Sequence, residues 1–197
     1  YLPNRLHSCL ETIQEQRADM IGSTIQLIDS TGQIIYKHWW IDNFTKIYGI
    51  LLEDNDWLST MFAGNLFMTS SNFFFRRSIL EKLSGFNDFI YVPDYEFLLR
   101  MIFLDYKFSW IETPLLQYRM HSSNTIYSNA IEANKESSKL IRQFLPQVSS
   151  KNKSISKILH NASLQLTLFE KYMLEELHLK HKGDIAEKDV LISERDK

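Results

Sequence analysis

The spacing of apolar and polar residues predicts most of the elements of this chain. From Pro93 onward, apolar side chains recur every three to four positions, which predicts a largely buried helix. Pro93 fixes its own backbone φ, and Asp94 is predicted to cap the helix because its carboxylate can accept from the free N–H groups of the first turn. Apolar and β-branched residues then predict two short strands, at 107–111 and 115–120, with Pro114 between them.

The same reasoning predicts the elements upstream of this helix. They are a helix over residues 3–16, a β-hairpin with strands at 23–28 and 33–37, a helix over 41–57 and a strand over 73–76. The turn of the hairpin is predicted at residues 29–32, which read Asp-Ser-Thr-Gly. Ser78 and Glu81 have the spacing of a capping box and Gly85 has the place of a helix end, so a short helix is predicted between them.

Downstream of Asn124 the pattern becomes helical, and glycine is absent until Gly183. One helix is predicted over 127–145, where Pro146 ends it, and a second over 154–180 with apolar residues near a 3.5-residue period. Apolar stripes of this size exceed what one edge of a small domain covers, so we expect these helices to support a homo-oligomer. We therefore divide the chain into a folded α/β part, a helical appendage and a charged tail or start of a coiled coil, at 1–125, 126–181 and 182–197.

The composition is typical of a soluble globular protein. The 197 residues suit one domain plus an appendage, and a hydrophobic content of 44% is enough for a core. A net charge of −2 gives no reason to expect binding to nucleic acid. Cys9 is the only cysteine, so an intramolecular disulfide is excluded and a reducing compartment is favoured. No apolar run approaches the ~20 residues that span a bilayer, and no signal peptide is visible, so we expect the chain in the cytoplasm or at the inner face of the membrane.

Four motifs follow one another between residues 72 and 124. They are Asn72 to Arg77, Ser84 to Asn87, Pro93 to Arg100, and Tyr118 to His121 with Asn124. In this order and spacing they resemble the C-terminal, acceptor-side half of a family 2 glycosyltransferase with the GT-A fold. The resemblance covers residues 1–125. It implies an α/β fold, consisting of a partial GT-A (Rossmann-like) glycosyltransferase domain followed by C-terminal α-helices.

The resemblance implies an inverting enzyme that transfers a sugar from a nucleotide-sugar to a glycan or lipid-linked acceptor, as in the synthesis of bacterial surface polysaccharides. Such a transfer needs a base for the proton of the acceptor hydroxyl, and a carboxylate can supply it. The resemblance assigns this base to Asp94, which the helix dipole is expected to keep ionised; the alternative is that Asp94 is only a helix cap. Glu96 is a second carboxylate in the same turn, expected to partner the dipole or to contact the acceptor weakly.

The departing nucleoside diphosphate needs positive charge. The resemblance therefore implies a divalent metal, Mn or Mg, in the complete enzyme, whereas this fragment on its own need not bind one. His121 belongs to a Tyr-Arg-x-His motif and is implied to complete the metal site; the alternative is a loop histidine bonded to backbone. Asp54 and Asp56 imitate a metal-binding Asp-x-Asp, but a solvated helix end is the better-placed interpretation.

Two adjacent tryptophans, Trp39 and Trp40, are candidates for binding the acceptor. The faces of their indole rings could stack on a sugar. Core packing is the commoner role of tryptophan, so the sequence is compatible with sugar stacking and with core packing.

The first residues, Tyr1 to Leu6, resemble the segment that follows the metal- and nucleotide-binding Asp-x-Asp of the family. We therefore expect this chain to be a fragment without the donor-binding half, to bind nucleotide-sugars no more tightly than millimolar, and to be inactive in isolation. A function of a different class is a non-catalytic interaction or oligomerisation module of a larger glycosyltransferase; an Asp-x-Asp upstream in the gene would favour the enzyme. A third is a metal-dependent hydrolase that uses Asp54 and Asp56. The sequence does not identify the sugar donor, the acceptor, the linkage or the oligomeric state.

Overall fold

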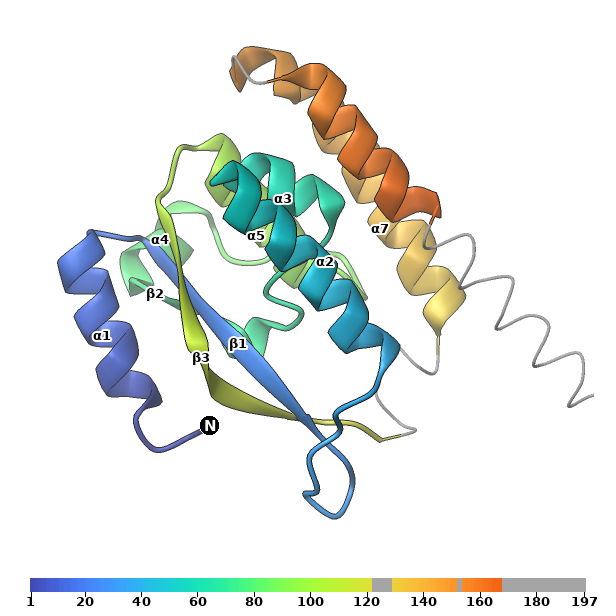
Figure 1. The fold of residues 1–197 in the computed structure, drawn as a ribbon. Helices are drawn as coiled ribbons and strands as arrows, with labels where there is room; N and C mark the ends of the chain where they lie inside the picture. Colours follow the sequence, from blue (N-terminus) through green and yellow to red (C-terminus); the bar gives the residue numbers. More distant parts are fainter. Residues whose placement is uncertain (122–128, 152–153, 168–197) are drawn as a thin grey trace, which may run out of the picture.

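The computed structural model describes residues 1–121, 129–151 and 154–167, which form a three-stranded sheet with helices on both faces (Figure 1). The elements are α1 Arg5–Gln16, β1 Met20–Ile28, α2 Trp39–Asp54, α3 Trp57–Ala63, the 3-10 turn η1 Ser70–Asn72, β2 Phe74–Phe75, α4 Arg77–Lys82, α5 Pro93–Phe103, β3 Phe108–Arg119, α7 Ala130–Phe144 and the 3-10 segment η2 Leu145–Lys151. A further helix occupies residues 155–167. The predicted class, an α/β domain followed by helices, is confirmed.

The sheet has the strand order β2-β1-β3, with β3 parallel and β2 antiparallel to the central strand β1. Adjacent residues of β1 face opposite sides, because successive side chains of a strand alternate. Ile21 packs in a small core with Cys9 and Ile13 of α1, whereas Met20 belongs to the main core on the other face, under α2, α3 and α5. The small core therefore lies between the sheet and α1, and the main core lies on the opposite face, under α2, α3 and α5 (Figure 1).

The two strands predicted at 107–111 and 115–120 form one strand, β3, so this prediction is wrong. The pairing of β1 with β3 shifts between Ser23, which lies opposite Ile111, and Ile25, which lies opposite Leu116. Pro114 lies in this shift, where its missing N–H costs no ladder hydrogen bond. The strand therefore passes the proline by bulging and does not end there.

The predicted hairpin over 23–37 is formed only in part. Beyond β1 there is a single antiparallel bridge between Ile28 and Ile34, and no second strand. The carboxylate of Asp29 accepts from the backbone N–H of Thr31 at 2.8 Å and of Gln33 at 2.9 Å, which folds the turn locally. The predicted turn is therefore formed, whereas the predicted second strand is reduced to one bridge.

Two predicted helix starts are also wrong. The short helix α4 begins at Arg77 and not at a Ser78 cap, and Glu81 binds the Arg77 side chain at 3.1 Å instead of closing a capping box. The helix α5 begins with Pro93 after Val92 as its first flanking residue, so Asp94 is a residue of the first turn and not the cap. Proline favours this first helical position because it has no N–H to leave unsatisfied.

The predicted helix over 41–57 begins two residues earlier and divides into α2 and α3. The side chain of His38 accepts from the N–H of Trp40 at 3.2 Å and so caps α2 at Trp39. Asn55 ends this helix in a left-handed conformation (φ 47°), and Asp56 then caps α3 by accepting from the N–H of Leu58 at 3.2 Å. One helical pattern in the sequence therefore folds as two helices.

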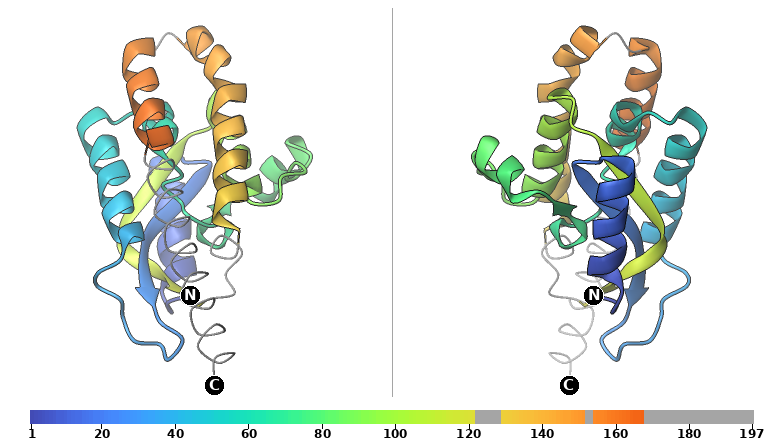
Figure 2. Two further views of the ribbon diagram at one scale, coloured as in Figure 1. Left: turned by 90° about the vertical axis from the view of Figure 1, so that its right-hand side faces the viewer. Right: turned by 90° about the vertical axis from the view of Figure 1, so that its left-hand side faces the viewer.

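The helices downstream of residue 125 belong to the main core. α7 and residues 155–167 run in opposite directions, with α7 beside α5 and the second helix beside α3 (Figure 2). They contribute buried apolar residues to the core that α5 occupies, namely Leu140, Ile141, Phe144, Ile158 and Ala162. Self-association and the division of the chain into domain and appendage stay predictions. The helix predicted beyond residue 167 and the charged tail lie outside the described residues.

None of the helices in the described part of the chain combines the length and the apolar character that crossing a bilayer requires.

Candidate active site

A cavity of about 150 Å³ lies where α2, α5 and α7 meet. Its lining residues come from the segment 39–43, the loop after α3, the start of α5, α7 and the last helix: Trp39, Trp40, Asn43, Ala63, Gly64, Asn65, Met68, Tyr91, Val92, Asp94, Tyr95, Ala133, Asn134, Ser137 and Gln165. Three of the residues predicted for the site, Asp94, Trp39 and Trp40, therefore line one cavity. Glu96 and His121 do not line it.

The carboxylate of Asp94 is held in a mostly apolar setting at the start of α5. One of its oxygens accepts from the backbone N–H of Tyr95 at 2.7 Å. Burial raises the pKa of Asp94 to about 6, while backbone N–H groups of Tyr95, Asp94 and Ser70 act in the opposite direction. The backbone N–H groups at the helix start therefore lower the pKa of Asp94, as expected, but burial raises it by more. The carboxylate is ionised at neutral pH and accepts a proton about one unit below it.

This raised pKa should be visible in the pH dependence of folding. Because folded Asp94 binds its proton more tightly than the unfolded chain does, wild type should lose stability relative to Asp94→Asn as the pH rises from about 4 to about 6. The total difference in unfolding free energy should be about 3 kcal/mol, since one pKa unit corresponds to about 1.4 kcal/mol. Urea denaturation of both proteins across this range measures it. A difference that does not vary with pH would mean that Asp94 titrates as an exposed carboxylate.

The two tryptophans have different roles. Trp40 is 6% exposed and packs against Tyr118, with ring centroids 5.3 Å apart. Trp39 is 40% exposed and lies nearly perpendicular to Trp40, at 86°. Core packing therefore describes Trp40, while Trp39 lines the same cavity and stays partly exposed.

Glu96 points into a different environment. Its side chain is 2% exposed, pairs with Arg100 at 2.7 Å and accepts from the amide of Asn87 at 2.8 Å. Arg100 also donates to the carbonyls of Leu83 and Gly85 at 2.7 and 2.8 Å. This network fastens α5 to the end of α4. The arrangement gives Glu96 a structural role.

His121 lies exposed just beyond the end of β3. Within the described residues, no group of three or more histidine, cysteine, aspartate or glutamate side chains could hold a metal ion. The described part of the chain therefore does not itself fit the divalent metal that the resemblance implies.

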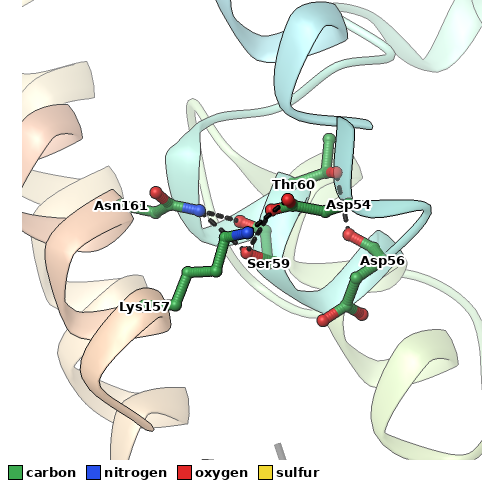
Figure 3. Close-up of polar contacts among 6 residues, drawn as sticks. All are labelled: Asp54, Asp56, Ser59, Thr60, Lys157 and Asn161. Atoms are coloured by element: carbon green, nitrogen blue, oxygen red, sulfur yellow. Dashed lines mark hydrogen bonds and ion pairs between the residues drawn. The ribbon is translucent and has the colours of Figure 1, made fainter. Parts of the chain in front are cut away.

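Asp54 and Asp56 do not form a metal site (Figure 3). Asp54 forms an ion pair with Lys157 of the last helix and lies 3.5 Å from the hydroxyl of Ser59. Asp56 is occupied as the cap of α3. Both aspartates therefore have structural partners, which removes the basis for a hydrolase that would use them.

The last helix docks through polar residues spaced four apart, Lys157, Asn161 and Gln165. Lys157 binds Asp54, and the amide of Asn161 donates to the carbonyl and hydroxyl of Ser59 at 3.1 and 2.8 Å (Figure 3). The amide of Gln165 lies 3.2 Å from the hydroxyl of Tyr95, which itself donates to the carbonyl of Met61. This spacing is visible in the sequence and could have indicated a polar face, although not the surface that it meets.

A glutamate fixes α7 to the segment that precedes Asp94. The carboxylate of Glu136 accepts from three consecutive backbone N–H groups, those of Ile90, Tyr91 and Val92, at 3.0, 2.6 and 3.1 Å. Free N–H groups at a helix start need such acceptors. Glu136 thereby holds one wall of the cavity against another, and no local pattern in the sequence indicates this contact.

Comparison with known proteins identifies the domain. A family model described as Glycosyl transferase family group 2 matches residues 2–147, which include α1 through α7 and the cavity residues except Gln165. No curated protein and no solved structure matched the chain. The observed α/β arrangement followed by helices is consistent with a partial GT-A-like domain. Because the matched region spans most of the chain, this protein belongs to glycosyl transferase family group 2.

Proposed function

We propose that this domain takes part in inverting transfer of a sugar from a nucleotide-sugar to a glycan or lipid-linked acceptor, with Asp94 as the general base. The family supplies the reaction class, sugar transfer. The observation that carries the assignment is the position of Asp94, an acidic side chain in a cavity edged by an accessible tryptophan ring. A base is most effective when its pKa lies near the working pH, and burial brings the pKa of Asp94 to about 6.

In this mechanism the acceptor hydroxyl enters the cavity and donates to the carboxylate of Asp94. As the hydroxyl oxygen attacks the anomeric carbon, its proton passes to Asp94 and a new C–O bond forms. The bond from the anomeric carbon to the diphosphate oxygen breaks on the opposite face, and the nucleoside diphosphate leaves with the bonding electron pair. The configuration at the anomeric carbon is inverted, and Asp94 later returns the proton to water.

The donor side of the reaction rests on the resemblance alone. A divalent metal, Mn or Mg, bound by oxygen ligands would neutralise the diphosphate, and a metal-binding role for His121 stays a proposal. Binding of nucleotide-sugar to this chain no tighter than millimolar also stays a prediction. A non-catalytic interaction module is the competing function. The enzyme and the interaction module differ in one measurable respect: only the enzyme needs Asp94 in its ionised form.

The pH dependence of transfer tests the proposal. In the protein expressed from its complete gene, kcat/KM should fall tenfold per pH unit below about pH 6, because only ionised Asp94 accepts the proton. The measurement is the initial rate of sugar transfer between pH 5 and 8, with folding monitored at each pH. A rate that is constant between pH 5 and 7 in the folded protein would exclude Asp94 as the base.

A further inference from the structure

Asn72 joins segments that are distant in the sequence, and its side chain is fully buried. Its amide nitrogen donates to the carbonyl of Ser23 at 2.7 Å and to the carbonyl of Phe67 at 3.4 Å. Its amide oxygen accepts from the backbone N–H of Ser23 at 3.2 Å and from the Ser23 hydroxyl at 3.1 Å. Asn72 therefore bonds to both backbone groups of Ser23, as a residue of a neighbouring strand does, and attaches the segment 65–72 to β1.

Arg5 of α1 strengthens this attachment. Its guanidinium donates to the amide oxygen of Asn72 at 3.4 Å and to the carbonyl of Ser71 at 3.2 Å. The residue is 4% exposed, and its guanidinium lies over the ring of Tyr1. A buried cation that loses its acceptors is costly, so this contact holds Ser71 and Asn72 against α1.

The segment 65–72 forms part of the cavity wall. Asn65 and Met68 line the cavity, and the side-chain oxygen of Asn65 accepts from the N–H groups of Phe67 and Met68 at 3.1 and 3.2 Å. Met68 has a φ of 63°, a left-handed conformation that residues other than glycine adopt at a cost in free energy. Such a conformation persists where surrounding contacts hold the chain, which is what the bonds of Asn65 and Asn72 do.

The 3-10 turn η1 connects Asn72 to the carboxylate of the site. Ser70 is the first residue of this turn and Asn72 the last. The N–H of Asn72 donates to the carbonyl of Thr69 at 3.0 Å, and the hydroxyl of Thr69 accepts from the N–H of Ser71 at 3.3 Å. These bonds fix Ser70 relative to Asn72. The backbone N–H of Ser70 in turn donates to the carboxylate of Asp94 and lowers its pKa.

We propose that Asn72, together with Arg5, is a positioning residue of the site: by attaching η1 to β1 and α1, it presents the N–H of Ser70 to the carboxylate of Asp94. Asn72 does not line the cavity, so it acts on Asp94 through Ser70. Its effect on transfer rests on the proposed function. The contact between Ser70 and Asp94 belongs to the folded protein and can be measured without transfer.

Two other carboxylates lie near the start of α5. Glu96 is held in its ion pair on the side of α4, and Glu136 of α7 accepts from the N–H groups of residues 90–92. Asp94 alone carries a charged side chain among the described residues that line the cavity. The contacts of Glu96 and Glu136 do not involve Asn72, so replacing Asn72 leaves them in place.

Asn72→Ala should raise the pKa of Asp94 by ~1 unit above its value of about 6, because the ionised carboxylate loses the bond from Ser70. The measurement is a carbon-13 NMR titration of the aspartate carboxyl groups between pH 4.5 and 8.5. The signal of Asp94 is identified by its absence from the spectrum of Asp94→Asn.

Arg5→Met is a second variant, which removes the donor to Ser71 and Asn72 but keeps a long side chain. It should raise the pKa of Asp94 by less than Asn72→Ala does, since the bonds between Asn72 and Ser23 remain. An unchanged or lowered pKa of Asp94 in whichever of these variants is folded would overturn the inference.

Val148→Ala is the control for loss of stability. Val148 is a buried apolar residue of η2, so its replacement weakens the core without touching η1 or Asn72. This variant should unfold at a lower urea concentration than wild type and keep the pKa of Asp94. The same rise in pKa as in Asn72→Ala would show a general effect of destabilisation and would refute positioning by Asn72.

The effect on transfer should depend on pH in the protein expressed from its complete gene. A pKa higher by ~1 unit reduces the ionised fraction of Asp94 about fivefold at pH 6 and hardly at pH 8. The value of kcat/KM for Asn72→Ala should therefore fall about fivefold at pH 6 and less than twofold at pH 8. An equal loss at both pH values would leave Asn72 with a structural role alone.

The outcomes separate this inference from the function on which it rests. If the pKa of Asp94 rises in Asn72→Ala while the pH dependence of transfer does not move, the positioning stands and Asp94 is not the base. If Asp94→Asn abolishes transfer while the pKa of Asp94 stays near 6 in the Asn72 and Arg5 variants, the base stands and the positioning fails.

Discussion

Replacing Asp94 by asparagine should reduce the rate of sugar transfer ~100- to 10,000-fold, which is the typical contribution of a general base. Asparagine keeps the size of the side chain and can still accept from the N–H of Tyr95, but it cannot take up a proton. Affinity for nucleotide-sugar should stay near wild type, because the base faces the acceptor. The measurement is transfer rate and donor affinity on the same protein, expressed from its complete gene.

Asp88→Asn provides the control for this experiment. Asp88 is an exposed aspartate in the loop before α5, so its replacement removes one charge from the same region without touching the cavity. It should leave transfer unchanged. Melting temperatures of all three proteins show whether any loss comes from unfolding. A transfer rate within a few-fold of wild type in folded Asp94→Asn would leave Asp94 with a structural role alone.

The second large effect concerns stability. Glu96→Ala should lower the free energy of unfolding by ~3–5 kcal/mol, the cost of removing one partner of a buried ion pair. The substitution leaves the mostly buried guanidinium of Arg100 and the amide of Asn87 without their carboxylate. Chemical denaturation at neutral pH measures this loss.

Two comparisons make the result specific. Glu81→Ala breaks the exposed ion pair with Arg77 and should change stability little, because solvent-exposed pairs contribute weakly. The double variant Glu96→Leu with Arg100→Met should be more stable than Glu96→Ala alone, since it removes both charges together. A loss below ~1 kcal/mol for Glu96→Ala would show that the ion pair is not buried in solution.

The sequence predicts the order of elements well because helical periodicity is a local property. The helix at Pro93 and the helix of α7 are both recognisable from it. The second strand of the hairpin was predicted from β-branched residues, but Asp29 folds the turn without a strand to follow. The strand β3 also continues past Pro114, because its pairing with β1 shifts register there. The pattern of residues within β3 alone does not reveal this, since the shift depends on the partner strand.

The sequence predicts three of the residues that line the cavity and misses the residues that α7 and the last helix contribute. Asp94, Trp39 and Trp40 are part of recognisable local patterns, and the cavity brings them together. Asn134 and Gln165 come from helices that are distant in sequence, and their place depends on contacts such as that of Glu136 with Tyr91. Only the packed structure shows that Asn134 of α7 and Asp94 of α5 line the same cavity.

The polar face of the last helix favours one register of docking. Lys157, Asn161 and Gln165 are one turn apart, and each meets a different group, at Asp54, Ser59 and Tyr95. Sliding the helix along its axis by one spacing of these residues, ~6 Å, would bring Asn161 to Asp54 and Gln165 to Ser59, but it would separate Lys157 from its carboxylate and the Tyr95 hydroxyl from its amide. The three contacts together therefore favour the register in which Gln165 lines the cavity.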